Sequence, residues 1–171
     1  INIQKILKNN KKIKAVNVIL QLSRTLPNHA KNFIDYAHTP NALETDIKTL
    51  KKHYNIITDV VFGCGGGRDK KKRSIMAKVC EKYAEKIYIT DDNPRNEHPS
   101  DIRKEILLGC PNAIEIPDRN NAIKYAVSEL NKNDLLLIAG KGHESFQVVG
   151  NQSLPFNDYN VAKETINNLI N

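Results

Sequence analysis

The segment DLLLIAG, residues 134–140, passes through five consecutive apolar side chains between an aspartate and a glycine. A second segment, IITDVVFG at residues 56–63, is also largely apolar and rich in β-branched residues. Strands that are apolar on both faces are typical of a parallel sheet that helices cover on both sides. The two segments therefore predict the centre of an α/β sheet.

In the rest of the chain, short apolar segments typical of strands alternate with longer segments whose apolar residues have helical spacing. Further strands are expected at residues 32–36, 86–90 and 113–116, and a hairpin at 146–156. Helices are expected at residues 41–54, 74–84, 100–109, 119–130 and 158–170, with Ser74, Ser100 and Asp118 as N-caps. We expect a Rossmann-like, mainly parallel sheet flanked by helices on both faces, with one antiparallel edge strand.

Composition narrows the classes of partner. The length of 171 residues suits one domain, and the net charge of +7 favours an anionic ligand. The lysines are scattered and there is no Trp, which argues against a nucleic-acid partner. No apolar run approaches the roughly 20 residues of a membrane span, so no membrane partner is expected. Cys64, Cys80 and Cys110 form no CxxC pair, which predicts no zinc site, no disulfide framework and a reducing, cytoplasmic setting.

The loop FGCGGGRDKKKRS, residues 62–74, sets four glycines beside five basic residues. Glycines let the backbone approach a ligand closely, and a following helix offers free N–H groups to an anion. The loop lacks the GK[ST] of a Walker A motif and the third glycine of the dinucleotide fingerprint. Two interpretations stay open, a flexible basic turn and an anion site that includes Arg68.

The loop TDDNPR, residues 90–95, carries both signs of charge directly after an expected strand. Arg95 can bind a carboxylate with two hydrogen bonds, and Asp91 or Asp92 can accept from an ammonium. Asn93 can serve either group. The alternative is an Asx-Pro turn with solvated charges.

Two more loops follow expected strands. AGKGHES, residues 139–145, places Lys141 between two glycines and then presents His143 and Glu144. DYAHTP, residues 35–40, carries Asp35 and His38, which form only a weak candidate for a catalytic dyad. Since ligands of such sheets bind beyond the carboxyl ends of the strands, these loops are expected to share one edge.

In this order and spacing, DYAHTP, VFGCGGGRDKKKR, TDDNPR and AGKGHE resemble the C-terminal domain of the Mur ligase family. The resemblance covers residues 33–165. Within the family, DNPR is similar to the recognition motif of the UDP-N-acetylmuramoyl-tripeptide synthetases that use meso-2,6-diaminopimelate, whereas lysine-adding members differ there.

The resemblance implies one part of a three-domain, ATP-dependent amide ligase of peptidoglycan precursor synthesis. Residues 31–171 would be the C-terminal, amino-acid-binding domain, and residues 1–30 a residual linker or the start of the domain. The N-terminal UDP-sugar domain and the central ATPase domain would be absent from this chain. The whole enzyme would use ATP and Mg²⁺ to turn UDP-MurNAc-L-Ala-D-Glu into an acyl phosphate, which the amine of diaminopimelate then attacks. The isolated domain is expected to be an inactive monomer with no tightly bound cofactor.

The resemblance also assigns residues. Diaminopimelate would contact a set of seven, namely Arg68, Asp92, Asn93, Pro94, Arg95, Gly140 and Glu144. Arg24, Asp35 and His38 would lie near the nucleotide, and no catalytic residue or metal ligand is expected. Because diaminopimelate carries two carboxylates and two ammonium groups, the mixed charges of the seven suit it. Arg95 would discriminate against lysine, which lacks the distal carboxylate.

The chain departs from the family pattern in having no P-loop and no magnesium-binding lysine segment. The family's Gly-Arg pair before the first strand is replaced by Ser23 and Arg24. The alternatives are a lysine-adding member, a related amide ligase such as a folylpolyglutamate synthetase, a stand-alone Rossmann-like nucleotide-binding module, and a basic nucleic-acid-binding protein.

Overall fold

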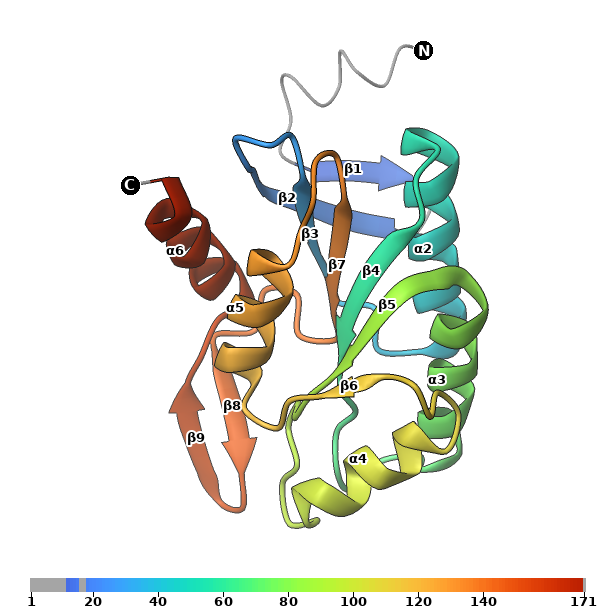
Figure 1. The fold of residues 1–171 in the computed structure, drawn as a ribbon. Helices are drawn as coiled ribbons and strands as arrows, with labels where there is room; N and C mark the ends of the chain where they lie inside the picture. The colour runs from blue at the N-terminus through green and yellow to red at the C-terminus, as the bar shows by residue number, and fades with distance from the viewer. Residues whose placement is uncertain (1–11, 16–17, 171) are drawn as a thin grey trace.

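The computed structural model of the protein describes residues 12–15 and 18–170. A seven-stranded sheet has the order β1-β2-β3-β7-β4-β5-β6, and a separate hairpin pairs β8 with β9 (Figure 1). The sheet strands are β1 (Lys12–Ala15), β2 (Val18–Thr25), β3 (Lys31–Asp35), β4 (Thr58–Phe62), β5 (Ala84–Ile89), β6 (Ile114–Glu115) and β7 (Leu135–Ala139). The hairpin strands are β8 (Phe146–Val149) and β9 (Gln152–Pro155). The helices are α2 (Pro40–Tyr54), α3 (Lys71–Tyr83), α4 (Pro99–Leu107), α5 (Arg119–Ser128) and α6 (Asp158–Ile170).

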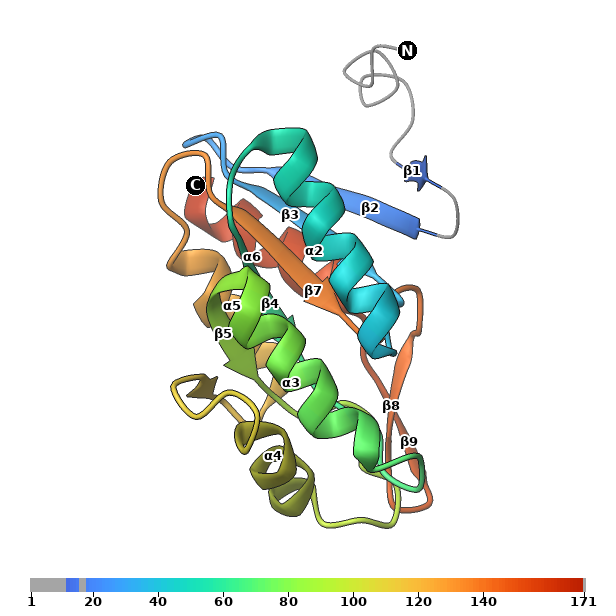
Figure 2. The same cartoon turned by 90° about the vertical axis from the view of Figure 1, so that its right-hand side faces the viewer.

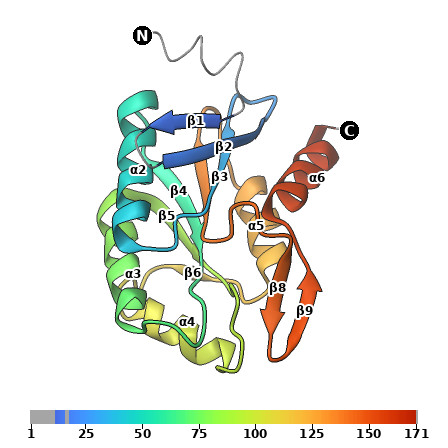
Figure 3. The same cartoon turned by 180° about the vertical axis from the view of Figure 1, so that it is seen from behind.

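The sheet is mainly parallel, as predicted. β3, β7, β4, β5 and β6 pair in parallel, whereas β2 is antiparallel to both of its neighbours. The one reversed strand therefore lies next to the edge strand β1, rather than at the edge itself (Figure 3). β2 also extends the sheet to the N-terminal side of the boundary expected at residue 31. Of residues 1–30, positions 1–11 and 16–17 lie outside the described residues.

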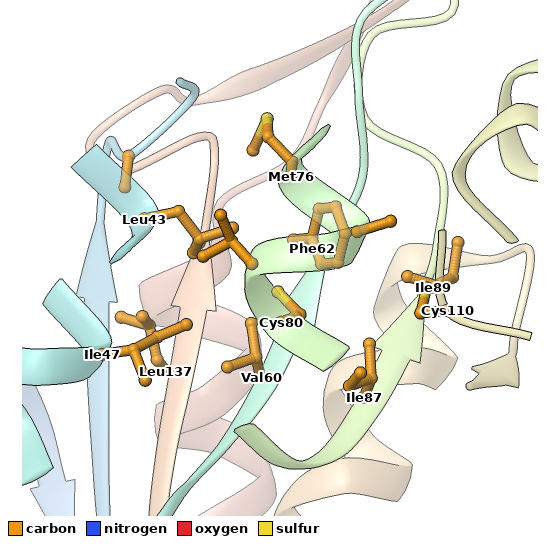
Figure 4. Packing of buried hydrophobic residues seen from close by; sticks show 14 of the residues in the cluster. Leu43, Ile47, Val60, Phe62, Met76, Cys80, Ile87, Ile89, Cys110 and Leu137 are labelled. Carbon is orange, nitrogen blue, oxygen red and sulfur yellow. The ribbon is translucent and has the colours of Figure 1, made fainter. Parts of the chain in front are cut away.

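Two helical layers cover the sheet because its central strands bury side chains on both faces. Leu135 and Leu137 of β7 pack with residues of α2, α3 and α4, whereas Leu136 and Ile138 pack with α5 and α6. Figures 1 and 2 show the two layers on opposite sides of the sheet. The close view in Figure 4 shows the core on the side of the sheet that α2, α3 and α4 cover. It includes Leu43 and Ile47 from α2, Met76 and Cys80 from α3, and Val60 and Phe62 from β4. This alternation along β7 explains why its sequence is apolar throughout.

The helix starts follow local capping chemistry. Thr39, the N-cap of α2, immediately precedes Pro40, and its side chain accepts a hydrogen bond from the Ala42 N–H. The predicted N-cap of α5, Asp118, accepts one from the Asn121 N–H. The prediction for Ser74 is wrong, because α3 already begins at Lys71. The earlier Asp69 carboxylate accepts from the Lys71 N–H at 2.9 Å, so the first turn includes the basic residues. The prediction for Ser100 is also wrong, because α4 begins at Pro99 after His98.

Among the described residues, no helix is both long and apolar enough to cross a membrane.

Candidate functional site

The carboxyl ends of four neighbouring parallel strands bring the candidate loops together. In register, Asp35 pairs with Ala139 at the ends of β3 and β7, and Phe62 pairs with Ile89 at the ends of β4 and β5. The loops that follow enclose a cavity of about 290 Å³. The cavity is lined by Tyr36, His38, Gly65, Arg68, Lys72, Asp92, Asn93, Arg95, Gly140 and Glu144.

Two other cavities, of about 240 and 380 Å³, lie at the opposite, amino-terminal ends of the strands and share Glu85 and Lys86. Volume therefore does not single out the site. The cavity at the carboxyl ends is distinguished by the guanidinium, ammonium, carboxylate and amide groups that line it from the segments after β4, β5 and β7.

The structure brings together most of the residues that the sequence singled out. Arg68, Arg95 and Glu144, which had to share one site for the hypothesis to stand, all line this cavity. A further four of the predicted residues also line it, namely His38, Asp92, Asn93 and Gly140. Three others, Pro94, Asp35 and Arg24, are not among the lining residues.

Each of those three has another role. Pro94 is buried, and its carbonyl accepts from the Glu97 N–H at 3.0 Å within the loop. Asp35 is buried at the end of β3, where burial and the hydrogen bond with Asp35 raise the pKa of the nearby Asp46 well above its ordinary value. Arg24 is exposed on β2 and hydrogen-bonds Asn167 of α6, so the structure does not bring Arg24 to the cavity.

Glycine allows the loops after β4 and β5 to meet. A Cβ atom on Gly66 would lie 1.9 Å from the Pro94 carbonyl oxygen, a separation that no side chain tolerates. The Gly66 N–H donates to the Asn93 carbonyl at 2.9 Å, and Arg95 Nη1 donates to the Gly66 carbonyl at 2.8 Å. The close approach thus fixes both arginine-bearing loops against each other.

Arg95 has a left-handed backbone, with φ of 52°, which non-glycine residues adopt uncommonly. Strand β8 supports this conformation from outside. The Arg95 N–H donates to the Val148 carbonyl at 3.1 Å, and the Gly150 N–H donates to the Arg95 carbonyl at 2.7 Å. The hairpin therefore positions the residue that was expected to discriminate between amino acids.

The acidic side of the cavity has a network of its own. Glu144 Oε2 accepts from Lys141 Nζ at 2.9 Å and from Asn93 Nδ2 at 3.0 Å. Burial raises the pKa of Glu144, but these two hydrogen bonds, together with the charges of Lys141 and Arg95, lower it below its ordinary value. Glu144 is thus an ionised acceptor for a cation.

The basic side consists of Arg68 and Lys72 with His38. Arg68 is exposed, and Lys72 Nζ donates to the His38 carbonyl at 2.9 Å. His38 Nδ1 lies 2.9 Å from the Tyr36 carbonyl oxygen, and the ring centroids of Tyr36 and His38 are 4.6 Å apart. With Arg95, these side chains bring positive charge to a cavity that Asp92 and Glu144 also line.

Arg73, one of the basic residues of the glycine loop, is buried and organises that loop. It donates to the Gly65 carbonyl at 3.2 Å, to Glu97 at 3.0 Å and to Glu105 at 2.8 Å. Glu97 in turn accepts from the Gly67 N–H at 2.7 Å; this bond and the ion pair with Arg73 lower the pKa of Glu97. The glycine-rich segment is therefore fastened at both ends and is not a loose basic turn.

Asp91, an alternative to Asp92 for receiving an ammonium, does not line the cavity. Its carboxylate pairs with Arg103, which also donates to Glu115 at 2.6 Å. Burial raises the pKa of Asp91, against the opposing effect of Arg103. The structure therefore leaves Asp92 as the acid of this loop that reaches the cavity.

Sequence reasoning missed Tyr36 and Lys72 as lining residues, and it left Lys141, Arg73 and Gln147 without a role. Tyr36, Lys72 and Lys141 belong to motifs that the sequence had singled out, so their neighbours were the available signal. Gln147, which donates to the Asp92 carbonyl at 2.5 Å, lies in the hairpin and carries no local signal.

Among the described residues, no group of three His, Cys, Asp or Glu side chains could hold a metal ion. The donor set of the cavity, with two arginines and a lysine among its residues, also does not suit a divalent cation. What the arrangement can do is bind a small molecule that carries carboxylate and ammonium groups at separate points.

Comparison with known proteins identifies the family of the chain. The family model "Mur ligase, glutamate ligase domain" matches residues 20–142. A protein of Rickettsia montanensis named UDP-N-acetylmuramoyl-L-alanyl-D-glutamate--2,6-diaminopimelate ligase is 51% identical over 139 residues, which are 78% of this chain and 29% of that protein. The chain thus spans less than a third of the length of the relatives it matches.

Solved structures give the same fold. A ligase whose structure carries the same name superposes with a TM-score of 0.83 at 35% identity, covering 89% of this chain and 32% of its own. A bifunctional folylpolyglutamate synthase/dihydrofolate synthase of Yersinia pestis, solved with AMPPNP and Mn, superposes at 0.57 with 12% identity, covering 88% and 30%. The second likeness concerns the fold alone.

Proposed function

This chain belongs to the Mur ligase family, and on that premise we propose that it is the amino-acid-binding domain of an ATP-dependent ligase. The ligase joins meso-2,6-diaminopimelate to UDP-N-acetylmuramoyl-L-alanyl-D-glutamate. The names of the similar proteins support this substrate pair.

The observation that carries the proposal is the division of charge within one cavity. Arg68 and Arg95 line it together with Asp92 and Glu144. Diaminopimelate has a carboxylate and an ammonium at each end, so the two guanidinium groups suit its carboxylates. The acids Asp92 and Glu144, with the carbonyl of Gly140, suit its ammonium groups.

In this scheme the domain positions the nucleophile. The remainder of the ligase supplies an acyl phosphate of the UDP-linked dipeptide, formed from ATP with Mg²⁺. The amine nitrogen of diaminopimelate attacks the acyl carbon, the C–N bond forms, the C–O bond to phosphate breaks, and the amine loses a proton. Holding the amine in place converts a bimolecular step into one within a complex, which is a large source of rate acceleration. Side chains around the cavity fix the other groups of the amino acid.

ATP and Mg²⁺ are assigned to the whole ligase and not to this chain. The sequence has no Walker A loop, and no metal-ligating cluster occurs among the described residues. Lys72 and His38 stand on the basic side, where a phosphate group could approach during domain closure. We further assign the chain a monomeric state and a cytoplasmic setting, without nucleic-acid or membrane partners.

The test is a chimeric ligase in which this chain replaces the matching C-terminal segment of the Rickettsia montanensis relative. ATP-dependent amide formation is measured with meso-diaminopimelate and with L-lysine. We expect diaminopimelate to be the better substrate in kcat/KM. A preference for lysine would contradict the specificity, and loss of amide formation with both amino acids in a folded chimera would contradict the domain assignment.

A further inference from the structure

Lys141 is a fully buried lysine at the back of the cavity. It has no exposed surface and is not among the residues that line the cavity, although its three partners, Asp92, Asn93 and Glu144, all line it. Its ammonium contacts Asn93 Oδ1 at 2.9 Å, Glu144 Oε2 at 2.9 Å and Asp92 Oδ1 at 3.4 Å. Lys141 therefore contacts three lining residues from the protein interior, without itself facing the cavity.

A lysine ammonium has three N–H donors, and these three acceptors can use all of them. A buried charge is costly unless it is paired and hydrogen-bonded, so Lys141 is bound to these partners. Because Asp92 and Asn93 follow β5 while Glu144 follows β7, Lys141 joins two loops. It has no donor left for a ligand.

Asn93 completes the network. Its Oδ1 also accepts from the Val148 N–H at 2.9 Å, and its Nδ2 donates to Glu144 Oε2 at 3.0 Å. Both hydrogen bonds to Glu144 thus fall on one oxygen. Within the described residues Glu144 Oε1 receives no hydrogen bond from the protein, which leaves that oxygen available to a cation in the cavity.

The charges of the network sum to one negative charge, since two carboxylates, Asp92 and Glu144, face one ammonium, Lys141. Without the lysine, two negative charges would share a partly desolvated wall, and like charges there favour protonation of one of them. One net negative charge is the complement of one ammonium group.

We propose that Lys141 is a positioning residue that fixes Asp92, Asn93 and Glu144 from behind the cavity wall, so that they present one net negative charge to an ammonium group of the bound amino acid. The part of this inference that names the ligand rests on the proposed function. The part that concerns the state of Glu144 does not.

The ionisation of Glu144 provides the independent readout. Burial raises the pKa of Glu144, and the hydrogen bonds from Lys141 and Asn93, together with the charges of Lys141 and Arg95, lower it. Other cations are also near Glu144. The buried Arg119 interacts electrostatically with Asp92 and Glu144, and Arg68, Lys72 and His38 line the same cavity. If Lys141 acts as proposed, these other cations do not suffice to keep Glu144 ionised.

The experiment is a ¹³C NMR titration of the Glu144 carboxyl in the 171-residue chain, with Glu144→Gln identifying the signal. In the unmutated chain the midpoint should lie below the ordinary value of 4.5. In Lys141→Met it should rise above that value, and in Lys141→Gln, which keeps a donor without the charge, it should lie between. Lys163→Met, at an exposed position of α6, is the matched control and should leave the midpoint unchanged.

A midpoint at or above 4.5 in the unmutated chain would overturn the proposal without any variant, so a failure of Lys141→Met to fold does not remove the test. An unchanged midpoint in a folded Lys141→Met chain would also overturn it.

Binding of meso-diaminopimelate to the same samples separates this inference from the proposed function. Lys141→Met should weaken binding by roughly tenfold or more, the effect of losing a charged hydrogen bond, and the loss should be greater at pH 5 than at pH 8. If the unmutated chain shows no shift of cavity signals with meso-diaminopimelate, the proposed function of the chain is contradicted. The titration of Glu144 still decides the role of Lys141.

Discussion

Arg95 Nη1 donates a 2.8 Å hydrogen bond to the carbonyl oxygen of Gly66, which joins the loop after β5 to the loop after β4. The same nitrogen lies 3.4 Å from the Asn93 carbonyl. One end of the guanidinium is therefore engaged by the protein. A carboxylate in the cavity would use the remaining N–H groups, held in a fixed direction by the Gly66 contact.

Replacing Arg95 should remove discrimination between diaminopimelate and lysine. We choose Arg95→Asn, because asparagine tolerates the left-handed backbone at this position and so isolates the loss of the guanidinium. The preference in kcat/KM should fall by about 1–3 kcal/mol, or roughly 5- to 150-fold, as expected when a charged hydrogen-bonding partner is lost. Steady-state kinetics of the chimera with the two amino acids checks this. An undiminished preference would exclude Arg95 as the discriminating residue.

Gly66→Ala should damage the cavity more than Gly65→Ala. The new Cβ would lie 1.9 Å from the Pro94 carbonyl oxygen, a backbone atom, in the first case, and 2.8 Å from Arg95 Nη1, the end of a long side chain, in the second. Since backbone must shift only for Gly66, we expect about 2–4 kcal/mol of lost unfolding free energy there and under about 1 kcal/mol at Gly65. Urea denaturation of both variants measures the difference. Equal losses would contradict the close contact of the two loops.

Arg73 and Lys70 form ion pairs with the same Glu97 but in different surroundings. The Arg73 side chain is 1% exposed and the Lys70 side chain 61% exposed. Arg73→Met should lower the unfolding free energy by about 2–3 kcal/mol, because it removes hydrogen bonds to Glu97, Glu105 and the Gly65 carbonyl. Lys70→Met should change it by less than about 0.5 kcal/mol. Thermal or urea unfolding of the pair checks this, and similar effects would mean that burial does not distinguish them.

The stability of the chain should depend on pH through Asp59. Burial raises the pKa of Asp59 to about 6, above the 3.8 of a free aspartate. The folded state therefore retains a proton that the unfolded state loses, so this contribution to stability is present at low pH and declines as pH rises from about 4 to about 6.

Asp59→Asn keeps an acceptor for the Lys86 N–H, which Asp59 Oδ1 now binds at 3.1 Å, and removes the titration. Relative to the unmutated chain, the variant should gain on the order of 2–3 kcal/mol between pH 4 and pH 7. Urea unfolding at four pH values in this window measures it. Parallel stability curves for the two proteins would show that Asp59 titrates normally.

The sheet could be predicted from the sequence because its central strands are apolar on both faces, a pattern typical of a covered parallel sheet. The apolar run of β7 has residues that face both helical layers, and no other element satisfies that pattern in so few residues. The strand β2 was not predicted, although it opens with the apolar residues Val18, Ile19 and Leu20, because residues 1–30 were expected to be a linker or the start of the domain. The start of α3 was missed because Ser74 is a good cap on propensity, whereas the helix start depends on Asp69 and on burying Arg73.

The meeting of the candidate loops at one cavity was predicted from the topology of the sheet. Loops that follow parallel strands must meet, which brought Arg68, Arg95 and Glu144 to one cavity. Local sequence could not show which of two adjacent acids faces inward, because Asp91 is drawn away by Arg103, a residue of the next helix. The structural roles of Lys141 and Gln147 also depend on partners about 50 residues away.

The β8–β9 hairpin stands apart from the main sheet, yet its backbone brackets Arg95 through Val148 and Gly150. Under the proposed function, the hairpin therefore contributes to amino-acid selectivity, whereas the packed layers of the main sheet hold the fold. An insertion or exchange in this ribbon would reshape what the cavity accepts while the packed layers go on folding as before, which offers an evolutionary route to a new amino-acid preference.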